Sequence, residues 1–447
     1  MLKKFFSKHD IYLSGLLVAL LLLGLFTLYS TTSGTGAENE SYFIKQTVYA
    51  SIGIFFYVII SFARLDWLKE KWFQILMYVV LVILLVAVLL FTAKVKGASR
   101  WFVMPIPFFG SINIQPADIA KLIVIINGAF ILTQWKKLSI RFKSSILKNE
   151  LTPYLLFLLP ILVLILIQPA LGTTIIVSLC LLFMFYFSRK TKNQILGYFA
   201  VFFIVLFFWI FLKDQRISVK LIISFIVSFL SIILLFKKSS KVILTLVFVF
   251  SSLFVFMIGR PESINLLGEY QKDRVDCWIL PEKDPTGKCF QQIQAKIAIG
   301  SGELFGRGFS QGLQVQRQSL PEFQNDFIYA AFAEQYGFIG TLVILAMFFL
   351  FISEIFRLST YQKSEFSRIV ILGIGMMFLL QVFINISMNN GLLPTTGISL
   401  PFMSYGGSFM WISLVGVGIV QNLSHSKILS ESEDAKYSKW DEDEYID

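Results

Sequence analysis

Apolar runs alternate with short polar segments along most of the chain. A helix needs about 20 apolar residues to cross the hydrocarbon core of a bilayer, because it rises about 1.5 Å per residue. The pattern predicts twelve transmembrane helices, at residues 11–30, 44–63, 72–93, 117–135, 151–168, 170–187, 195–212, 218–236, 241–259, 327–355, 367–389 and 399–422. We therefore expect an all-α polytopic membrane protein, in which residues 1–423 form a single integral membrane domain. The first run is as long as a full span, so we interpret it as a retained helix and not as a cleaved signal peptide.

Basic side chains gather in every second connection between these runs. The connections carry Lys3, Lys4 and Lys8; Arg64, Lys69 and Lys71; Lys136, Lys137, Arg141, Lys143 and Lys148; Arg189, Lys190 and Lys192; Lys237, Lys238 and Lys241; and Arg357, Lys363 and Arg368. Because cytoplasmic loops carry an excess of Lys and Arg, this alternation predicts that both termini lie in the cytoplasm. The intervening connections, including the long segment 260–326, are then expected outside. The basic segment 213–220 departs from this rule.

Composition agrees with this class of protein and narrows its functions. Of 447 residues, 56% are hydrophobic and only 15% are charged, as is typical of a polytopic membrane protein. The net charge of +11 does not indicate nucleic-acid binding, because the basic residues lie in short loops and not on one polar face. The acidic tail 424–447 is predicted to be a disordered cytoplasmic segment. No group of His, Cys and carboxylate residues has the spacing of metal ligands, so a structural zinc site is not expected.

The long polar segment 284–340 leads directly into a predicted span. It brings one carboxylate, Asp326, to the mouth of that span, where a charge is costly and is usually retained for a function. The glycine-rich run 300–308 beside it suits a close approach of the backbone to a ligand, or a sharp turn. We expect a lipid-facing active-site loop here. The alternative is that Asp326 only caps the following helix, because Asp is favoured at that position.

Two further features lie between predicted spans. The loop 93–118 contains prolines and glycines that exclude a helix through it. Asp118 at its end would complement the dipole of the next helix and can pair with Lys121, three residues later, on one helix face. An ordinary salt bridge at the end of a span explains this spacing equally well. At Gln168-Pro169 we expect a tight turn, because Pro has no backbone N–H and interrupts a helix.

The outer segment also holds Cys277 and Cys289, two of the three cysteines in the chain. A disulfide can persist outside the cytoplasm, and the turn signals at Pro281 and Asp284 can bring the two thiols together. We predict this bridge, with two free thiols as the alternative.

Six short motifs, in order along the chain, resemble those of one known family. They are GASRW at 97–101, similar to GARRW; QPADIAK at 115–121, similar to QPSE-x-x-K; QPALGT at 168–173, similar to QPDLGT; AKIAIGSG at 295–302, similar to SKIAIGSG; LPEFQNDFI at 320–328, similar to LPE-x-HTDFIF; and GLLP at 391–394 with PFMSYGGS at 401–408. The chain thereby resembles the SEDS family of cell-wall polymerases (shape, elongation, division and sporulation) over nearly the whole membrane region. Asp284, Pro285 and Gly287 favour its elongation branch, RodA, over its division branch, FtsW.

The resemblance implies transfer of a glycan from lipid II, a disaccharide-peptide on undecaprenyl pyrophosphate, at the outer face of the bacterial cytoplasmic membrane. It implies that Asp326 is the general base of this transfer. The departing pyrophosphate needs positive charge, and we expect the outer-side cations Arg100, Lys121 and Arg307 to bind near it, with Glu322, the nearest second acid, in a supporting role at the substrate. Structural support is expected from Asp118, Trp101, Gln168, Pro169, Ser404 and Gly406. A divalent cation, Mg²⁺ or Mn²⁺, that bridges the phosphates and Asp326 is a competing arrangement that the sequence leaves open.

The chain departs from the family pattern in three respects. Ala170 replaces the acid of QPDLGT, Gln324 and Asn325 replace the His-Thr pair before Asp326, and the family has ten spans where twelve are predicted here. An inserted pair of spans within 198–258 accounts for the difference. The resemblance implies a class B penicillin-binding protein, a transpeptidase, as partner, together with other membrane proteins of cell-wall elongation. Two other functions stay open: a lipid II flippase, and a non-catalytic scaffold for that partner.

Overall fold

The computed structural model describes residues 10–33, 37–92, 100–106, 110–139, 151–168, 170–188, 269–312 and 323–424. The chain divides into two compact units, one of Met1–Phe185 with Cys277–Asp447 and the other of Tyr186–Asp276. Only the end of α7 and most of α11 (Glu269–Ile279) belong to the described part of the second unit. The architecture below is that of the first unit.

Nine of the twelve predicted spans fall within the described residues, and each contains a helix. The helices are α2 (Ile11–Thr32), α3 (Ala37–Phe62), α4 (Lys71–Phe91), α5 (Pro116–Ser139), α6 (Leu151–Ile167), α7 (Leu171–Phe187), α14 (Ile328–Thr360), α15 (Glu365–Asn389) and a final helix, Gly407–Ser424. Seven of them are long and apolar enough to cross a membrane, while α6 and α7 have 17 residues each. The prediction of an all-α polytopic membrane protein is confirmed.

Three of the predicted spans, 195–212, 218–236 and 241–259, lie outside the described residues, as does almost all of the acidic tail. The total of twelve spans, the inserted pair and the disordered tail therefore stay predictions.

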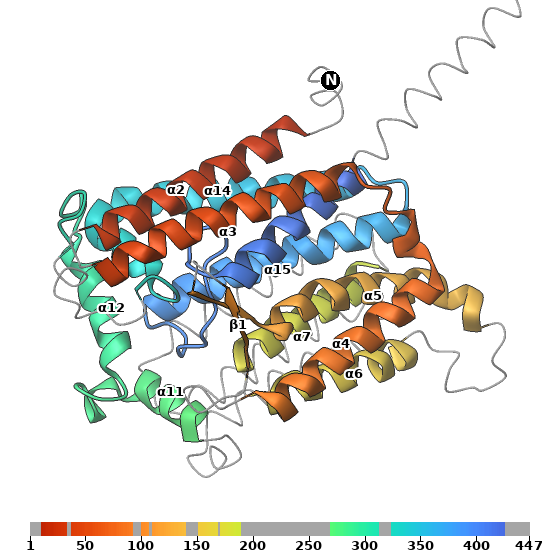
Figure 1. Ribbon diagram of the computed structural model, residues 1–447, viewed down its shortest axis with the longest axis horizontal. Coiled ribbons are helices and arrows are strands. Elements are labelled where there is room, and N and C mark those ends of the chain that lie inside the picture. The colour runs from red at the N-terminus through yellow and green to blue at the C-terminus, as the bar shows by residue number, and fades with distance from the viewer. Residues whose placement is uncertain are drawn as a thin grey trace, which may run out of the picture. The chain divides into compact units, whose positions relative to one another are not determined.

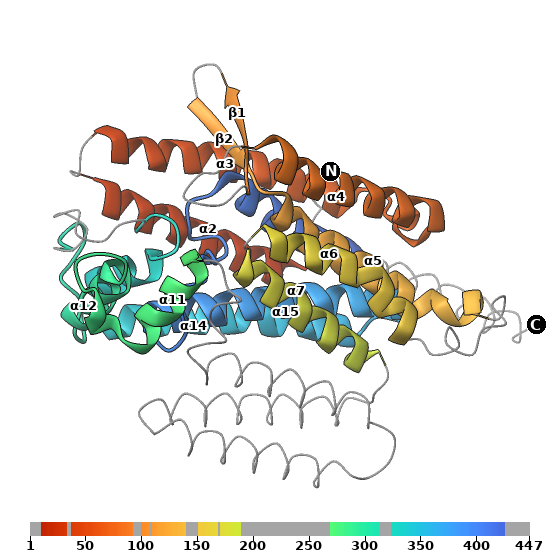
Figure 2. The same ribbon diagram turned by 90° about the horizontal axis from the view of Figure 1, so that it is seen from below.

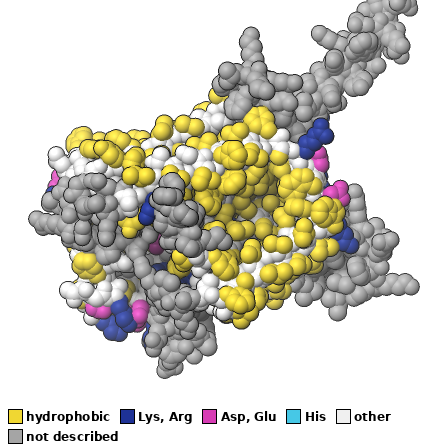
Figure 3. Space-filling view, in the orientation of Figure 1, with side chains coloured by type: hydrophobic (Ala, Val, Ile, Leu, Met, Phe, Trp, Pro, Cys, Tyr) yellow, Lys and Arg dark blue, Asp and Glu magenta, His cyan; other side chains and the backbone are white. Residues whose placement is uncertain are grey.

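The helices of the first unit form an interior and a lipid-facing exterior. α5, α15 and the final helix are mostly buried, whereas α2, α3, α4 and α14 expose much of their apolar surface. α2 packs against α3 and α14, and the three run side by side in Figure 1. Figure 3 shows hydrophobic side chains in a broad band over α3 and α4. Large exposed apolar surfaces of this kind mark contact with a membrane or partner, and their extent here fits a lipid-facing face.

Hydrogen bonds between helix ends show which connections share one end of the bundle. Asp10, which caps α2, accepts a hydrogen bond from Arg357 near the end of α14 at 3.1 Å. Ser14 of α2 and Tyr57 of α3 are hydrogen-bonded at 2.9 Å, and Asn422 of the final helix donates to three carbonyls that end α3. The basic connections after α3 and α14 therefore lie at the same end, as the charge alternation predicts.

A β-hairpin joins α4 to α5. β1 (Phe102–Ile106) pairs antiparallel with β2 (Gly110–Ile114), so that Phe102 lies opposite Ile114. Figure 2 shows the hairpin projecting from the helices. The sequence correctly excluded a helix in this loop, but it did not predict the strands. The predicted tight turn at Gln168 is confirmed, because α6 ends at Ile167 and α7 begins at Leu171.

α14 is broken near its start, although the sequence predicted one continuous span. Gly337 has φ 64° and ψ −163°, which interrupts the helix. The freed N–H groups of Phe338 and Ile339 donate to the carbonyls of Glu303 and Leu304, at 2.8 and 3.1 Å. In return, the glycine-rich run donates to α14 through the N–H groups of residues 307 and 308. The run thus lies against the backbone of α14 and makes a sharp turn, which is one of the two predicted roles.

The last predicted span begins later than expected. Residues 392–406 are irregular and the helix starts at Gly407, not at residue 399. Two prolines, Pro394 and Pro401, lie in this stretch and disfavour a helix because each lacks an N–H. The segment is held instead by local bonds, such as the Leu400 N–H donating to the Ser404 hydroxyl at 2.7 Å. The segment 392–406 is therefore an ordered but irregular connection between α15 and the final helix.

Candidate functional site

The turn 323–327 places Asp326 two residues before the start of α14. Phe323 and Phe327 are buried and pack against Ala295 and Ala298 of α12 (Phe290–Ser301), which anchors the turn on both sides of the half-buried Asp326. The N-cap position of α14 is occupied by Phe327, and no side chain caps the helix there. These contacts hold the turn in place on both sides of Asp326.

The main chain of Asp326 is held by two asparagines of α15. The side-chain amides of Asn385 and Asn389 each donate to the Asp326 carbonyl, both at 3.0 Å. Asn385 also donates to the Ile398 carbonyl at 2.7 Å. The turn and the irregular segment 392–406 are therefore joined through one buried side chain.

The irregular segment contacts the turn a second time through Tyr405. Its N–H donates to the Gln324 carbonyl at 2.7 Å, and its ring meets Tyr42 edge to face at 5.0 Å between centroids. Burial, with smaller contributions from Tyr49 and Tyr42, raises the pKa of the Tyr405 hydroxyl above its ordinary value of 10.0. The hydroxyl stays protonated at neutral pH, so Tyr405 is not a competing general base.

Gln46 of α3 fixes the residues on either side of Tyr405. Its amide donates to the Ser404 carbonyl at 3.0 Å and accepts from the Gly406 N–H at 3.1 Å. Ser404 is fully buried. Ser404 and Gly406, both predicted to give structural support, therefore lie in the hydrogen-bonded segment that leads to the Asp326 turn.

The predicted pair Asp118–Lys121 forms in the first turns of α5. The Lys121 ammonium lies 2.7 Å from an Asp118 carboxylate oxygen, and both side chains are buried, at 5% and 10% exposed. The same ammonium lies over the Phe409 ring, 5.0 Å from its centroid. The N–H of Gln115, just before the helix, faces the Ser408 hydroxyl at 3.4 Å. This end of α5 is thus joined to the start of the final helix.

Arg307 belongs to a different network. Its Nε donates to the Ser301 hydroxyl at 3.3 Å and lies 4.0 Å from a carboxylate oxygen of Glu334, a fully buried residue of α14. The Arg307 side chain is 37% exposed, which leaves part of the guanidinium open to a ligand. Glu334 follows Asp326 by about two helical turns.

Arg100 lies beside the turn between α6 and α7. Its Nε donates to the Gln168 carbonyl at 3.0 Å, and the Gln168 amide donates to the Leu85 carbonyl of α4 at the same distance. Trp101 follows and is half-buried. Glu322 and Pro169 lie outside the described residues.

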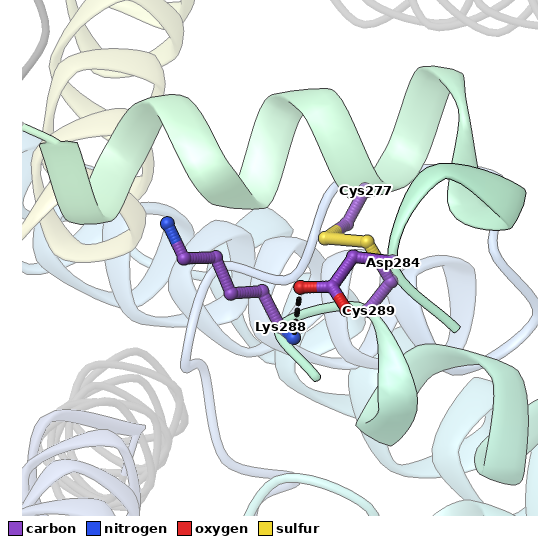
Figure 4. Close-up of a disulfide and its surroundings, with 4 residues drawn as sticks. All are labelled: Cys277, Asp284, Lys288 and Cys289. Carbon is purple, nitrogen blue, oxygen red and sulfur yellow. Dashed lines mark hydrogen bonds between the residues drawn. A yellow bond between two sulfur atoms is a disulfide. The ribbon is translucent and has the colours of Figure 1, made fainter. Parts of the chain in front are cut away.

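A disulfide-bonded loop, residues 277–289, leads into α12. Cys277 and Cys289 are joined by a disulfide, and between them the Asp284 carboxylate accepts from the Lys288 N–H at 3.0 Å (Figure 4). Trp278, next to the first cysteine, donates its indole N–H to the Gly391 carbonyl at 3.2 Å. The disulfide-bonded loop is therefore hydrogen-bonded to Gly391, two residues after Asn389.

The structure brings together some of the predicted site residues and separates others. Asp326, Ser404, Gly406 and Lys121 are connected through the segment 398–409, whereas Arg307 and Arg100 each belong to a network of their own. Within the described segments no group of three or more His, Cys, Asp and Glu side chains could hold a metal ion.

The sequence pattern alone did not indicate Asn385, Asn389 or Gln46 as functional residues. A signal was present for the first two. Amide side chains one helical turn apart inside an apolar span are costly unless they have partners, and the run from Asn385 to Asn390 contains three of them.

A family model described as a cell cycle protein, which groups FtsW, RodA and SpoVE, matches residues 11–226 and 219–428. A probable peptidoglycan glycosyltransferase FtsW of Trichlorobacter lovleyi is 32% identical over 94% of this chain and 93% of its own length. The peptidoglycan glycosyltransferase MrdB of Escherichia coli is 30% identical over 96% and 98%. The peptidoglycan glycosyltransferase RodA of Treponema pallidum is 27% identical over 94% and 98%.

Solved structures show the same fold. A chain of a peptidoglycan synthase complex that coordinates polymerisation and crosslinking matches with a TM-score of 0.64 at 21% identity, over 94% of this chain and 98% of its own. The rod shape determining protein RodA of Thermus thermophilus matches with a TM-score of 0.56 at 20% identity, over 94% and 97%. The matches of the family model and of the relatives together cover nearly the whole membrane region, and from them we conclude that the chain belongs to the FtsW, RodA and SpoVE family, the SEDS proteins.

Proposed function

We propose that this membrane protein is a peptidoglycan glycosyltransferase that polymerises lipid II. The observation that carries the proposal is the position of Asp326. This half-buried carboxylate lies in the turn before α14, a helix that exposes apolar side chains, and the turn is hydrogen-bonded to the irregular segment 392–406. Its relatives carry the names of peptidoglycan glycosyltransferases, which supports the same reaction class.

The reaction needs one base and a stabilised leaving group. The acceptor sugar hydroxyl attacks C1 of the donor, a bond from its oxygen to C1 forms, and the bond from C1 to the pyrophosphate oxygen breaks. Asp326 takes the hydroxyl proton, and the electron pair leaves with the lipid pyrophosphate. A single dominant carboxylate suits a displacement with inversion at C1, because a covalent sugar intermediate needs a second one close by.

Cations at the site would stabilise the departing pyrophosphate through charge-assisted hydrogen bonds. Arg307 suits this role best, because its side chain is 37% exposed and its partner Glu334 orients it. Lys121 is already paired with Asp118 and is buried, so it would act on the phosphates only through its field or after a rearrangement. Arg100, half-buried on the Gln168 carbonyl, is the third candidate, and Glu322 keeps its proposed role near the substrate.

The cellular setting is part of the proposal. We place the site at the outer face of the cytoplasmic membrane, with both termini inside, and a class B penicillin-binding protein as partner. The match to a complex that coordinates polymerisation and crosslinking supports such a partner. Because relatives named FtsW and RodA are both similar to this chain, the assignment to elongation rests on the motif at 284–287.

The flippase alternative is less well supported. Transport of a charged headgroup requires ionisable side chains deep within the spans. Among the described helices, Lys121 of α5 and Glu334 of α14 are buried ionisable residues, and they form ion pairs with Asp118 and Arg307. This arrangement favours chemistry at the surface.

The test is polymerisation of lipid II by the purified protein in complex with its transpeptidase partner. Asp326→Ala should lower the rate by about 10²–10⁴-fold, the usual contribution of a general base, while the thermal unfolding of the protein is unchanged. Assays with and without a chelator test the alternative in which a divalent cation bridges the phosphates and Asp326, because only that arrangement requires the cation for activity. Polymer formed at the normal rate by the Asp326→Ala protein, or movement of lipid II across vesicles without polymer from the wild type, would overturn the proposal.

A further inference from the structure

Two asparagines of α15 meet at a single backbone oxygen. Asn385 and Asn389 lie one helical turn apart, and both are fully buried, at 0% exposed. Each side-chain nitrogen is 3.0 Å from the Asp326 carbonyl oxygen. Two donors on one carbonyl use both of its lone pairs.

The remaining hydrogens of the two amides are also used. Asn385 donates to the Ile398 carbonyl at 2.7 Å, and Asn389 donates to the carbonyl of Asn385 at 2.9 Å. All these partners are carbonyl oxygens, which only accept. The NH₂ groups, and not the amide oxygens, must therefore face the turn, so the orientation of both side chains follows from the chemistry.

This arrangement determines where α14 begins. The helical ladder starts with the Ala331 N–H donating to the Phe327 carbonyl at 3.1 Å. A helix that began one residue earlier would need the Asp326 carbonyl as its first acceptor, and that oxygen is occupied by the two amides. Asp326 is kept outside the helix, one residue before its N-cap Phe327, so its backbone is not that of a helical residue.

We propose that Asn385 and Asn389 are positioning residues for the glycosyl transfer. By holding the Asp326 carbonyl they keep its carboxylate aligned with the acceptor hydroxyl, and through Ile398 they couple this alignment to the irregular segment 392–406. The inference rests on the proposed function of Asp326 as the base. A purely structural role for the two amides would predict lower stability with normal turnover per folded molecule.

The experiment compares Asn385→Ala, Asn389→Ala and the double variant in the lipid II polymerisation assay, with the protein in its complex. A displacement of about 1 Å at a reacting group can cost about 10²-fold in rate. We expect kcat to fall by about 10- to 100-fold in each single variant, with the KM for lipid II within about twofold of the wild type. Because both amides act on one oxygen, the double variant should lose less than the product of the two single losses.

Asn390→Ala is the matched control. Asn390 is the next residue, and its amide donates to the Ile386 carbonyl, one turn earlier in α15, at 2.8 Å. Its kcat should equal that of the wild type.

Each outcome has a distinct meaning. Unchanged kcat in folded Asn385→Ala and Asn389→Ala proteins, with Asp326→Ala inactive, would overturn the positioning role and leave the proposed function in place. An active Asp326→Ala protein would instead overturn the proposed function. If Asn385→Ala does not fold, Asn389→Ala is decisive alone, because Asn385 then still connects residues 326 and 398.

Discussion

Replacing Gly337 by Ala places a methyl group where two backbones meet. The Cβ atom would lie 2.7 Å from the carbonyl carbon and oxygen of Leu304, and closer still to the N–H of Gly306. Neither neighbour is the flexible end of a side chain, so relief requires the glycine-rich run to move away from α14.

The magnitude follows from two contributions. Backbone angles of φ 64° and ψ −163° belong to a region that only glycine adopts readily, and the strain for another residue is about 1–3 kcal/mol. Overpacking against a rigid neighbour adds about 1–3 kcal/mol. Together the substitution should destabilise the protein by about 2–6 kcal/mol, and the bonds from Phe338 and Ile339 to the run would be lost or lengthened.

The assay is thermal unfolding of the purified protein in detergent, together with lipid II polymerisation. Gly300→Ala is the matched control: Gly300 lies in α12, and a Cβ there meets nothing within 4 Å. That substitution should be neutral or stabilise the protein by about 0.5–1 kcal/mol, since Ala is a better helix former than Gly. Equal midpoints of unfolding for Gly337→Ala and Gly300→Ala would refute the reasoning.

Two further predictions concern the Asp118–Lys121 ion pair and the Cys277–Cys289 disulfide. Lys121→Met leaves the buried Asp118 carboxylate uncompensated and should cost about 3–5 kcal/mol, while the double change Asp118→Leu with Lys121→Met should recover most of it; a double variant no more stable than Lys121→Met, measured by thermal unfolding, would contradict this. The denatured chain should titrate one thiol before reduction, that of Cys180, and three after it, and Cys277→Ser with Cys289→Ser should lower the stability by about 3 kcal/mol. Equal thiol counts before and after reduction would show that the two cysteines are not paired.

The features predictable from the sequence are those that depend on neighbours along the chain. The length and apolarity of one segment are enough to identify it as a span, whatever the other segments are. The positions of α2 to α5 therefore followed from the pattern alone. The pairing of Asp118 with Lys121 needs only the three-residue spacing of a helix. The tight turn at Gln168 needs only the missing N–H of a proline.

Features that depend on distant parts of the chain could not be predicted in the same way. Asn385 and Asp326 are 59 residues apart, and nothing local indicates that one holds the other. A glycine inside an apolar run usually costs about 1 kcal/mol and leaves the helix intact, so the break at Gly337 becomes necessary only when the run 303–308 supplies new partners for the freed N–H groups. The late start of the final helix follows from local prolines and could have been found.

The contact between the glycine-rich run and α14 has a consequence for which substitutions the protein tolerates. Recognition there occurs between peptide groups, so the sequence is constrained mainly at positions that have no side chain. Leu304 and Phe305 in the middle of the run point outward, at 60% and 79% exposed. Their identity can vary with the surrounding lipid or a docked protein, while Gly306 and Gly337 must stay for the two stretches of backbone to touch.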